Sequence, residues 1–305
     1  TSIMPDALRW LWKDYPKQVA NVVGNKRRTD VLIPGEDWEI VSDGHKFTEG
    51  PVFADNGDLF FSDIPSNKII RITADGEEQV FASATAGANG LMIGPDGKLY
   101  ACANGSKQIV KYDIRTAQKT IVVNDINSND LVLLPSGGYA TDPTNHKIWH
   151  FTYDGKKTEV VSDIRFPNGI HTSLDQEFLL VTGTRGRFNT GFQINTDGTL
   201  SNRQQYGHLH RGDLDDDTGA DGVTMDTLGR LYVTTRMGVQ ILDQLGRVHL
   251  ILDKPGEGWL SNATFGGPDR NWLFVTCGQS VYKRKLKARG VNTANGPVKP
   301  PRPNL

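Results

Sequence analysis

Two acidic residues stand in the same local setting, each directly before a glycine and a mostly apolar stretch. Glu49 opens the stretch EGPVF and Asp221 opens DGVTM. Asparagine occupies the same place in four similar stretches: Asn89 (NGLMI), Asn129 (NDLVL), Asn168 (NGIHT) and Asn262 (NATFG). All six side chains offer a carboxylate or amide oxygen. Such ligands favour a hard divalent cation such as Ca²⁺, Mg²⁺ or Mn²⁺ over metals that prefer thiolates.

The six stretches are the starts of an internal repeat. They are separated by 40, 40, 39, 53 and 41 residues. Ten residues after each start a second strand is expected, beginning at Leu59, Leu99, Tyr139, Phe178, Leu231 and Trp272. A period of about 40 residues with two clear strands and room for two more is typical of a propeller blade. The sequence therefore predicts an all-β fold, a six-bladed β-propeller.

The last copy of the repeat lacks a fourth strand downstream, where the sequence is rich in Gly, Pro and Asn. We expect WEIVS, residues 38–42, to supply that strand and close the ring, which would remove exposed sheet edges. The predicted domains are an N-terminal arm over 1–37 with a short helix, the propeller over 38–290, and a C-terminal tail over 291–305. The longest repeat interval contains an insertion, residues 206–220.

Equivalent positions in the blades meet beside the central channel of a propeller, so the six repeat starts are expected to form one polar ring. Two carboxylates in a narrow, partly dehydrated space either shift a pKa or share a cation, because burial of an uncompensated charge is costly. The alternative is a water-filled channel lined by amides, with Glu49 paired to a nearby Lys or Arg.

Five motifs carry a resemblance to a known family: TEGPVF, NDLV, FPNGI, ADGVTMD and NATFGGPDRNWLFVT. In this order, over about residues 38–286, the chain resembles the gluconolactonase/regucalcin family, also called the senescence marker protein family. The resemblance implies a six-bladed propeller with one catalytic divalent cation that hydrolyses lactones, often sugar aldonolactones. Matched motif by motif, it implies Glu49, Asn168 and Asp221 as metal ligands and Asn129 as a residue that binds substrate.

The residue types suit that chemistry. A Lewis-acidic cation polarises a lactone carbonyl, and Asp221 could use a free oxygen to orient or deprotonate the attacking water. Ca²⁺ is the expected ion, with Mg²⁺, Mn²⁺, Zn²⁺ and Fe²⁺ as alternatives. Many relatives carry an Arg shortly before the ND motif, whereas this chain reads NDINSNDL. This departure leaves the sugar specificity open.

Other candidate residues have simpler interpretations. His171 is expected to be a packed or wall histidine, with a general base as the alternative. The pair His208 and His210 and the acidic DLDDDTG are interpreted as solvated loop, and Arg185 and Arg236 as members of ion pairs rather than binders of an anionic product. The sequence contains no G-x-S-x-G elbow and no Gly-rich phosphate loop.

Composition excludes some partners. With 34 Lys and Arg against 35 Asp and Glu the formal charge is -1, so nucleic acid is not an expected partner. No apolar run approaches the roughly 18 residues of a membrane span. The two cysteines, Cys102 and Cys277, are expected as small strand hydrophobes.

We therefore predict a monomer or small homo-oligomer that acts on a small-molecule lactone. The start at Thr1 fits a removed signal peptide or a shortened chain, which slightly favours a periplasmic or secreted location. Three alternatives stay open: a propeller hydrolase of another ester or a phosphotriester, a non-catalytic binding propeller, and a condensing propeller similar to strictosidine synthase.

Overall fold

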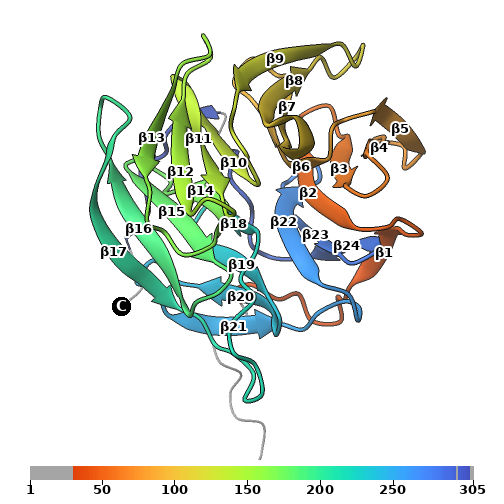
Figure 1. The fold of residues 1–305 in the computed structure, drawn as a ribbon. Helices are drawn as coiled ribbons and strands as arrows, with labels where there is room; N and C mark the ends of the chain where they lie inside the picture. The colour runs from red at the N-terminus through yellow and green to blue at the C-terminus, as the bar shows by residue number, and fades with distance from the viewer. Residues whose placement is uncertain (1–29, 293–294, 303–305) are drawn as a thin grey trace, which may run out of the picture.

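Six four-stranded antiparallel sheets surround a central channel in the computed structural model, which describes residues 30–292 and 295–302 (Figure 1). The predicted all-β, six-bladed propeller is therefore confirmed. The helix expected in the N-terminal arm falls outside the described residues. Within them, one short 3₁₀ helix, η1 (Asn104–Ser106), follows a strand of the second blade.

Each blade runs from an innermost strand beside the channel to an outermost strand at the periphery (Figure 1). Blade one contains β2 (Thr48–Phe53), β3 (Leu59–Asp63), β4 (Lys68–Ile72) and β5 (Glu78–Ser83); blade two contains β6 (Ala88–Ile93), β7 (Leu99–Ala103), β8 (Gln108–Tyr112) and β9 (Lys119–Asn124). Blade three contains β10 (Leu131–Leu134), β11 (Gly137–Asp142), β12 (Lys147–Phe151) and β13 (Lys157–Val161); blade four contains β14 (Pro167–Thr172), β15 (Phe178–Gly183), β16 (Phe188–Ile194) and β17 (Leu200–His208). Blade five contains β18 (Val223–Met225), β19 (Leu231–Thr235), β20 (Gly238–Leu242) and β21 (Val248–Leu252).

The sixth blade is completed from the other end of the chain. It contains β22 (Leu260–Gly266), β23 (Trp272–Cys277), β24 (Ser280–Lys285) and, as its outermost strand, β1 (Glu39–Ser42). β1 pairs antiparallel with β24, with Ile40 opposite Tyr282. The predicted ring closure by the segment WEIVS is confirmed.

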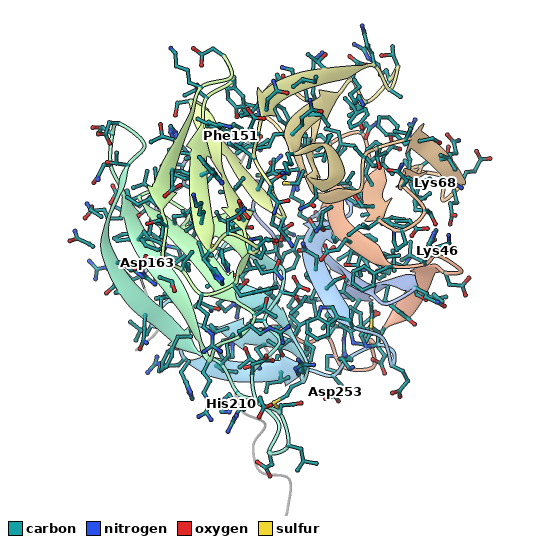
Figure 2. The ribbon with its side chains drawn as sticks, in the orientation of Figure 1. Lys46, Lys68, Phe151, Asp163, His210 and Asp253 are labelled. Atoms are coloured by element: carbon teal, nitrogen blue, oxygen red, sulfur yellow. The ribbon has the colours of Figure 1, made fainter. Side chains whose placement is uncertain are left out.

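Burial follows the position of a strand within its blade. The second strands are buried on both faces, as in β3 and β7, because each blade packs between two neighbours. Most outermost strands, such as β5, are more exposed, whereas β21 of blade five is half-buried or buried throughout. Figure 2 shows side chains filling the space between the blades, with charged residues such as Lys68 and Asp163 toward the outer edge.

Hydroxyl side chains connect neighbouring blades at the level of the channel. Ser62 donates to the Asn89 carbonyl at 2.8 Å, and Thr141 donates to the Asn168 carbonyl at 2.7 Å. Thr182 donates to the Asp221 carbonyl at 2.5 Å. In these three bonds a residue of the second strand of one blade fixes the backbone where the next blade's repeat begins. The links therefore hold the ends of the innermost strands in register around the channel.

The C-terminal segment crosses one end of the propeller. Gly290 forms an isolated bridge with Asp226, and the Val291 amide donates to the Met225 carbonyl at 3.2 Å. Farther along, the Val298 amide donates to the Leu174 carbonyl at 2.6 Å. The tail thus runs from blade six past blades five and four. No helix in the described ranges is long and apolar enough to cross a membrane.

Candidate metal and active site

Glu49 lies buried at the channel, in the innermost strand of blade one. Its Oε2 accepts hydrogen bonds from the Gly50 amide at 2.5 Å and from the Asn262 side-chain amide at 3.1 Å. No Lys or Arg among the described residues pairs with it, so the alternative of a salt-bridged Glu49 is not supported. Burial raises the pKa of Glu49 from 4.5 to about 7, although both hydrogen bonds act to lower it.

A third buried carboxylate, Asp130, joins the two predicted acids. Asp130 directly follows Asn129 and stands where the other repeats carry Gly or Ala, at Gly50, Gly90, Gly169, Gly222 and Ala263. A Cβ added to Gly90 would come within 2.1 Å of Asp130 Oδ1, so the missing side chain at Gly90 leaves room for this carboxylate. Burial raises the pKa of Asp130 well above its usual range, and the charge of Glu49 raises it further.

Asp221 is buried just before β18 and is fixed by an aromatic neighbour. The Trp259 indole N–H donates to Asp221 Oδ2 at 2.6 Å. Burial raises the pKa of Asp221 well above its usual range, and the negative charges of Glu49 and Asp130 raise it further. The three carboxylates are therefore close enough to influence one another electrostatically, and their environment contains no compensating basic side chain that the structure describes.

The amides of the ring supply oxygen atoms without partners. Asn168 is buried in β14, and its Nδ2 donates to Thr184 Oγ1 at 3.0 Å, which leaves Oδ1 without a hydrogen bond. The Oδ1 atoms of Asn89 and Asn129 are likewise buried and unpaired. Buried polar atoms without a partner are rare, so three acceptors beside three carboxylates favour a bound positive charge.

The carboxylate and amide oxygens of the ring are ligands of the kind that a divalent cation prefers. They are all oxygen atoms, they are dehydrated, and the set carries formal negative charge. Across the described part of the chain, no three His, Cys, Asp or Glu side chains form a group that could hold a metal ion. The ligand set predicted from the sequence contains just two carboxylates and relies on the Asn168 amide for its third ligand.

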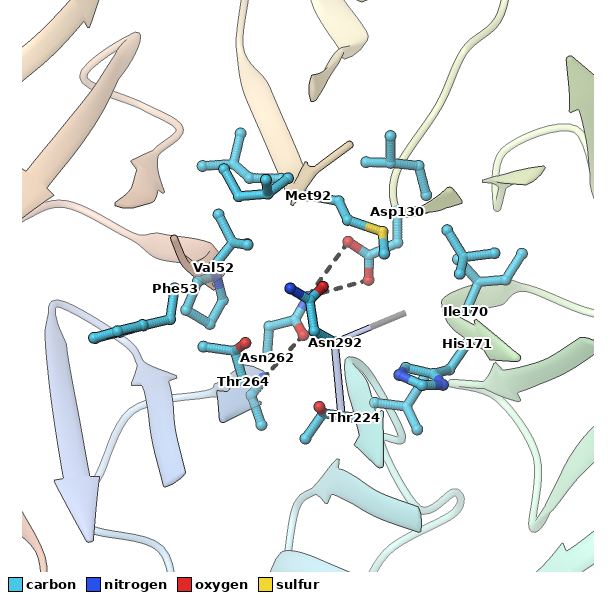
Figure 3. A pocket seen from close by; sticks show the side chains of 18 of the residues that line it. Val52, Phe53, Met92, Asp130, Ile170, His171, Thr224, Asn262, Thr264 and Asn292 are labelled. Atoms are coloured by element: carbon cyan, nitrogen blue, oxygen red, sulfur yellow. Dashed lines mark hydrogen bonds between the residues drawn. The ribbon is translucent and has the colours of Figure 1, made fainter. Parts of the chain in front are cut away.

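Past the ring, the channel contains a cavity of about 100 Å³. Its wall includes Met92, His171 and Thr224 from the innermost strands, and Asn292 of the C-terminal segment lies at its centre in the close view (Figure 3). The cavity lies between the ring, represented by Asp130 and Asn262, and the tail. The tail therefore covers this end of the channel.

His171 is part of that cavity wall and not of the ring. Its Nδ1 is 2.7 Å from the Thr172 carbonyl oxygen, and burial lowers its pKa. The interpretation of His171 as a wall histidine is consistent with this placement.

A second cleft, of about 360 Å³, is lined by Arg236, Lys254, Glu257 and Trp259, among others, and Trp259 connects it to Asp221 of the ring. Arg236 and Arg185 both form ion pairs with Asp217, at 3.1 and 3.2 Å, so the ion-pair interpretation of the two arginines is confirmed. Asp217 belongs to the acidic DLDDDTG stretch and is buried together with Thr218, so the interpretation of this stretch as solvated loop is wrong at its end, where the arginines hold Asp217.

The insertion begins later than the sequence suggested, because β17 continues through His208, and residues 209–222 connect β17 to β18. The rings of His208 and His210 lie 6.5 Å apart and belong to no metal-binding group of the described chain. Cys102 and Cys277 are free and buried, as expected for strand hydrophobes.

Two residues of the site, Asp130 and Trp259, were not singled out by sequence reasoning, and the contacts of a third, Asn262, were not foreseen. Asp130 had an available signal, since it is the one acid at the small-residue position of the repeat. Asn262 was placed in the ring, but its bonds to both Glu49 and Asp130 were not foreseen. Trp259 precedes the sixth repeat by three residues and gave no signal, because its contact with Asp221 depends on the path of a loop.

Together the fold and the site define a class: six-bladed β-propellers with an acidic, oxygen-rich ring at the mouth of a covered channel. The sequence profile of the SMP-30/Gluconolactonase/LRE-like region matches residues 47–279, and the chain belongs to this family. The resemblance drawn from the five motifs is thereby confirmed.

Two curated relatives extend over most of the chain. A gluconolactonase of Zymomonas mobilis is 28% identical over 293 residues, covering 83% of this chain and 82% of its own length. A pentonolactonase of Haloferax volcanii is 26% identical over 254 residues, covering 78% and 83%.

Solved structures share the fold at lower identity. A gluconolactonase from Xanthomonas campestris superposes with a TM-score of 0.75 at 23% identity, covering 86% of this chain and 92% of its own. A calcium-binding regucalcin from Agrobacterium tumefaciens gives a TM-score of 0.71 at 19% identity, covering 83% and 96%.

Proposed function

We propose that this protein is a divalent-metal-dependent lactonase that hydrolyses a sugar aldonolactone. Glu49, Asn168 and Asp221 hold the cation, and Ca²⁺ is the expected ion. The names of the gluconolactonase and pentonolactonase relatives support the substrate class, and the calcium-binding regucalcin supports the ion.

The observation that carries the proposal is the electrostatic state of the ring. Glu49, Asp130 and Asp221 are all buried, and burial raises the pKa of each. A propeller that kept these acids for structure alone would bear their desolvation cost without a partner. A bound divalent cation removes that cost, and the unpaired Asn168 Oδ1 completes an all-oxygen ligand set.

A cation bound in the ring would polarise the lactone carbonyl as a Lewis acid. Trp259 donates to Oδ2 of Asp221, so Oδ1 is left to bind the cation, and the remaining lone pair of Oδ2 would orient the attacking water and accept its proton. Asn129 orients the substrate through its unpaired Oδ1, which can accept a hydrogen bond from a sugar hydroxyl. Asp130 is the remaining carboxylate beside the ring and offers a second acceptor for hydroxyl groups.

Substrate enters from the side of the cleft beside Trp259, since Asn292 and Val291 line the opposite end of the channel. A polyhydroxylated lactone suits this position. The ring presents acceptors without basic side chains, and an acceptor-rich surface binds neutral hydroxyl donors better than anions.

The proposal is tested by removing the metal. The protein is dialysed exhaustively against a chelator, elemental analysis verifies the loss, and hydrolysis of D-glucono-1,5-lactone is followed with a pH indicator. We expect activity to disappear and to return on addition of Ca²⁺ or another divalent ion. Full activity in protein shown to be metal-free would refute the mechanism. A metal-dependent protein that cleaves phosphotriesters and no lactone would instead support the related hydrolase.

A further inference from the structure

The indole of Trp259 is placed to control the orientation of Asp221. Its N–H donates to Asp221 Oδ2 at 2.6 Å, a short bond to a buried carboxylate. A hydrogen bond from a neutral donor to an ionised acceptor is stronger and more directional than one between neutral groups. With Oδ2 held in this way, Oδ1 is the oxygen left to face the ring.

The indole is in turn held by an arginine from blade five. The Arg236 guanidinium lies over the Trp259 ring, with its central carbon 4.8 Å from the ring centroid. Arg236 Nε donates to Asp217 Oδ1 at 3.1 Å, and the Arg236 amide donates to the Thr218 carbonyl at 3.0 Å. The guanidinium is about one third exposed, so these contacts, rather than burial, fix its place over the indole.

The backbone of the connection after blade four packs against the same pair. Gly219 has φ +58, and a Cβ there would lie 2.6 Å from Arg236 Cγ and 3.0 Å from the Trp259 ring. The Gly219 amide also donates to Asp217 Oδ1 at 3.0 Å. A glycine is required for the chain to approach both side chains this closely.

We propose that Trp259 is a positioning residue for Asp221, and that the connection after blade four sets the indole through Asp217 and Arg236. This inference rests on the proposed function, in which Asp221 binds the cation and handles the attacking water. Partners outside the ligand sphere that orient a ligating side chain commonly matter for metal affinity or activity. Here the orienting group comes from blade six, and its own support comes from the connection between blades four and five.

The first test uses Ca²⁺ alone and needs no substrate. Because the indole N–H is bonded to a proposed ligand, Ca²⁺ binding to metal-depleted protein should alter tryptophan absorbance and fluorescence. Trp259→Phe should abolish this change at full Ca²⁺ occupancy, as measured by calorimetry. Trp149→Phe is the matched control, because the Trp149 N–H also donates to an aspartate, Asp142, at 3.4 Å, and cationic side chains, here two lysines, also lie over its ring. The control should keep the full change.

The outcomes separate the two proposals. If the wild-type protein binds Ca²⁺ and Trp259→Phe keeps the spectral change, the positioning role alone is overturned. The same conclusion follows if the wild-type protein binds Ca²⁺ with no change in its tryptophan spectra. A wild-type protein that binds no divalent cation by calorimetry would overturn the metal site as well, and the positioning role with it.

The second test measures lactone hydrolysis in a mutant cycle. Trp259→Phe keeps an aromatic face for Arg236 but removes the donor, so we expect kcat to fall about tenfold with KM nearly unchanged. Asp217→Asn should lower kcat only about threefold in the wild-type background, less than the roughly 10–100-fold typical of a residue bonded directly to a ligand, because Asp217 acts through Arg236 and Trp259. In Trp259→Phe it should have no further effect, because the indole no longer holds Asp221. An equal drop from Asp217→Asn in both backgrounds would refute the connection through Trp259. Asp217→Asn provides a readable variant even if Trp259→Phe fails to fold.

Discussion

Asn262 donates its side-chain amide to both carboxylate oxygens of Asp130, at 3.3 and 3.1 Å, across the channel from blade six to blade three (Figure 3). The same amide reaches Glu49. One neutral group thus bridges two buried acids. In the protein without a cation, hydrogen bonds from this amide stabilise both carboxylates but do not neutralise their negative charge.

Replacing one of these acids should stabilise the metal-free protein. Asp130→Asn removes a desolvated charge, and its amide can still present an oxygen to Asn262, so we expect a higher melting temperature at pH 8. Asp58→Asn is the control of opposite sign: Asp58 is buried but bonded to Arg71 at 2.6 Å. Loss of a hydrogen bond to a charged group costs about 1.5–3 kcal/mol. Thermal melts in which both variants were destabilised would argue against the desolvation cost assigned to the buried charge of Asp130.

Metal-free protein should lose stability as the pH rises. The pKa of Glu49 is raised from 4.5 to about 7, so between these values the folded state holds a proton that the unfolded state has released. The raised pKa values of Asp130 and Asp221 act in the same direction. Stability therefore falls from about pH 4.5 upward and stays low above the folded pKa values.

Cation binding should show the converse pH dependence. Protons compete with the cation for these carboxylates, so Ca²⁺ affinity should weaken below about pH 7, by up to tenfold per pH unit for each proton displaced. Melting curves from pH 5 to 8, with and without Ca²⁺, measure both effects. A metal-free melting temperature that rises across this range would contradict the assignment.

The proposed ligands should differ in their response to excess metal. Glu49→Gln, Asn168→Ala and Asp221→Asn should each weaken binding while the fold survives. A saturating cation should restore part of the activity to Asn168→Ala but little to Asp221→Asn, since an amide can still bind the ion but cannot accept a proton. Loss of general-base help costs about 10²–10⁴-fold in rate. Near wild-type turnover by fully occupied Asp221→Asn would place the base elsewhere.

Truncation should reveal the contribution of β1 to the ring. Deleting residues 1–44 exposes the edge of β24 and also removes Ser42, whose Oγ donates to Glu78 of blade one at 2.6 Å. Deleting residues 1–30 spares both β1 and the buried Val31. We expect a much larger drop in melting temperature for the longer deletion, and equal melting temperatures would count against a structural role for β1.

The repeat made the fold predictable, whereas the site was predictable in part. Spacing identified Glu49, Asn168 and Asp221 as equivalent positions at the channel, because periodicity reports which residues share a place in each blade. It does not report which side chains turn inward. Asp130 enters the channel because Gly90 leaves space for it, a relationship between two blades that no single repeat contains.

The contacts of Trp259 were unpredictable for a different reason. Its bond to Asp221 joins residues 38 positions apart, and Trp259 lies on a loop that does not follow the repeat. The connection from 209 to 222 that supports it lies where the repeat spacing breaks. Regular periodicity thus specifies the scaffold, and the irregular segments decide how its functional groups are oriented.

The pairing of β1 with β24 also constrains synthesis. β1, which ends at Ser42, cannot pair until β24, which begins at Ser280, has been synthesised. At about 5–20 residues per second, the ribosome needs on the order of tens of seconds to make the intervening chain. Until β24 is made, β1 has no strand to pair with. This delay makes ring closure a late step in the folding of the propeller.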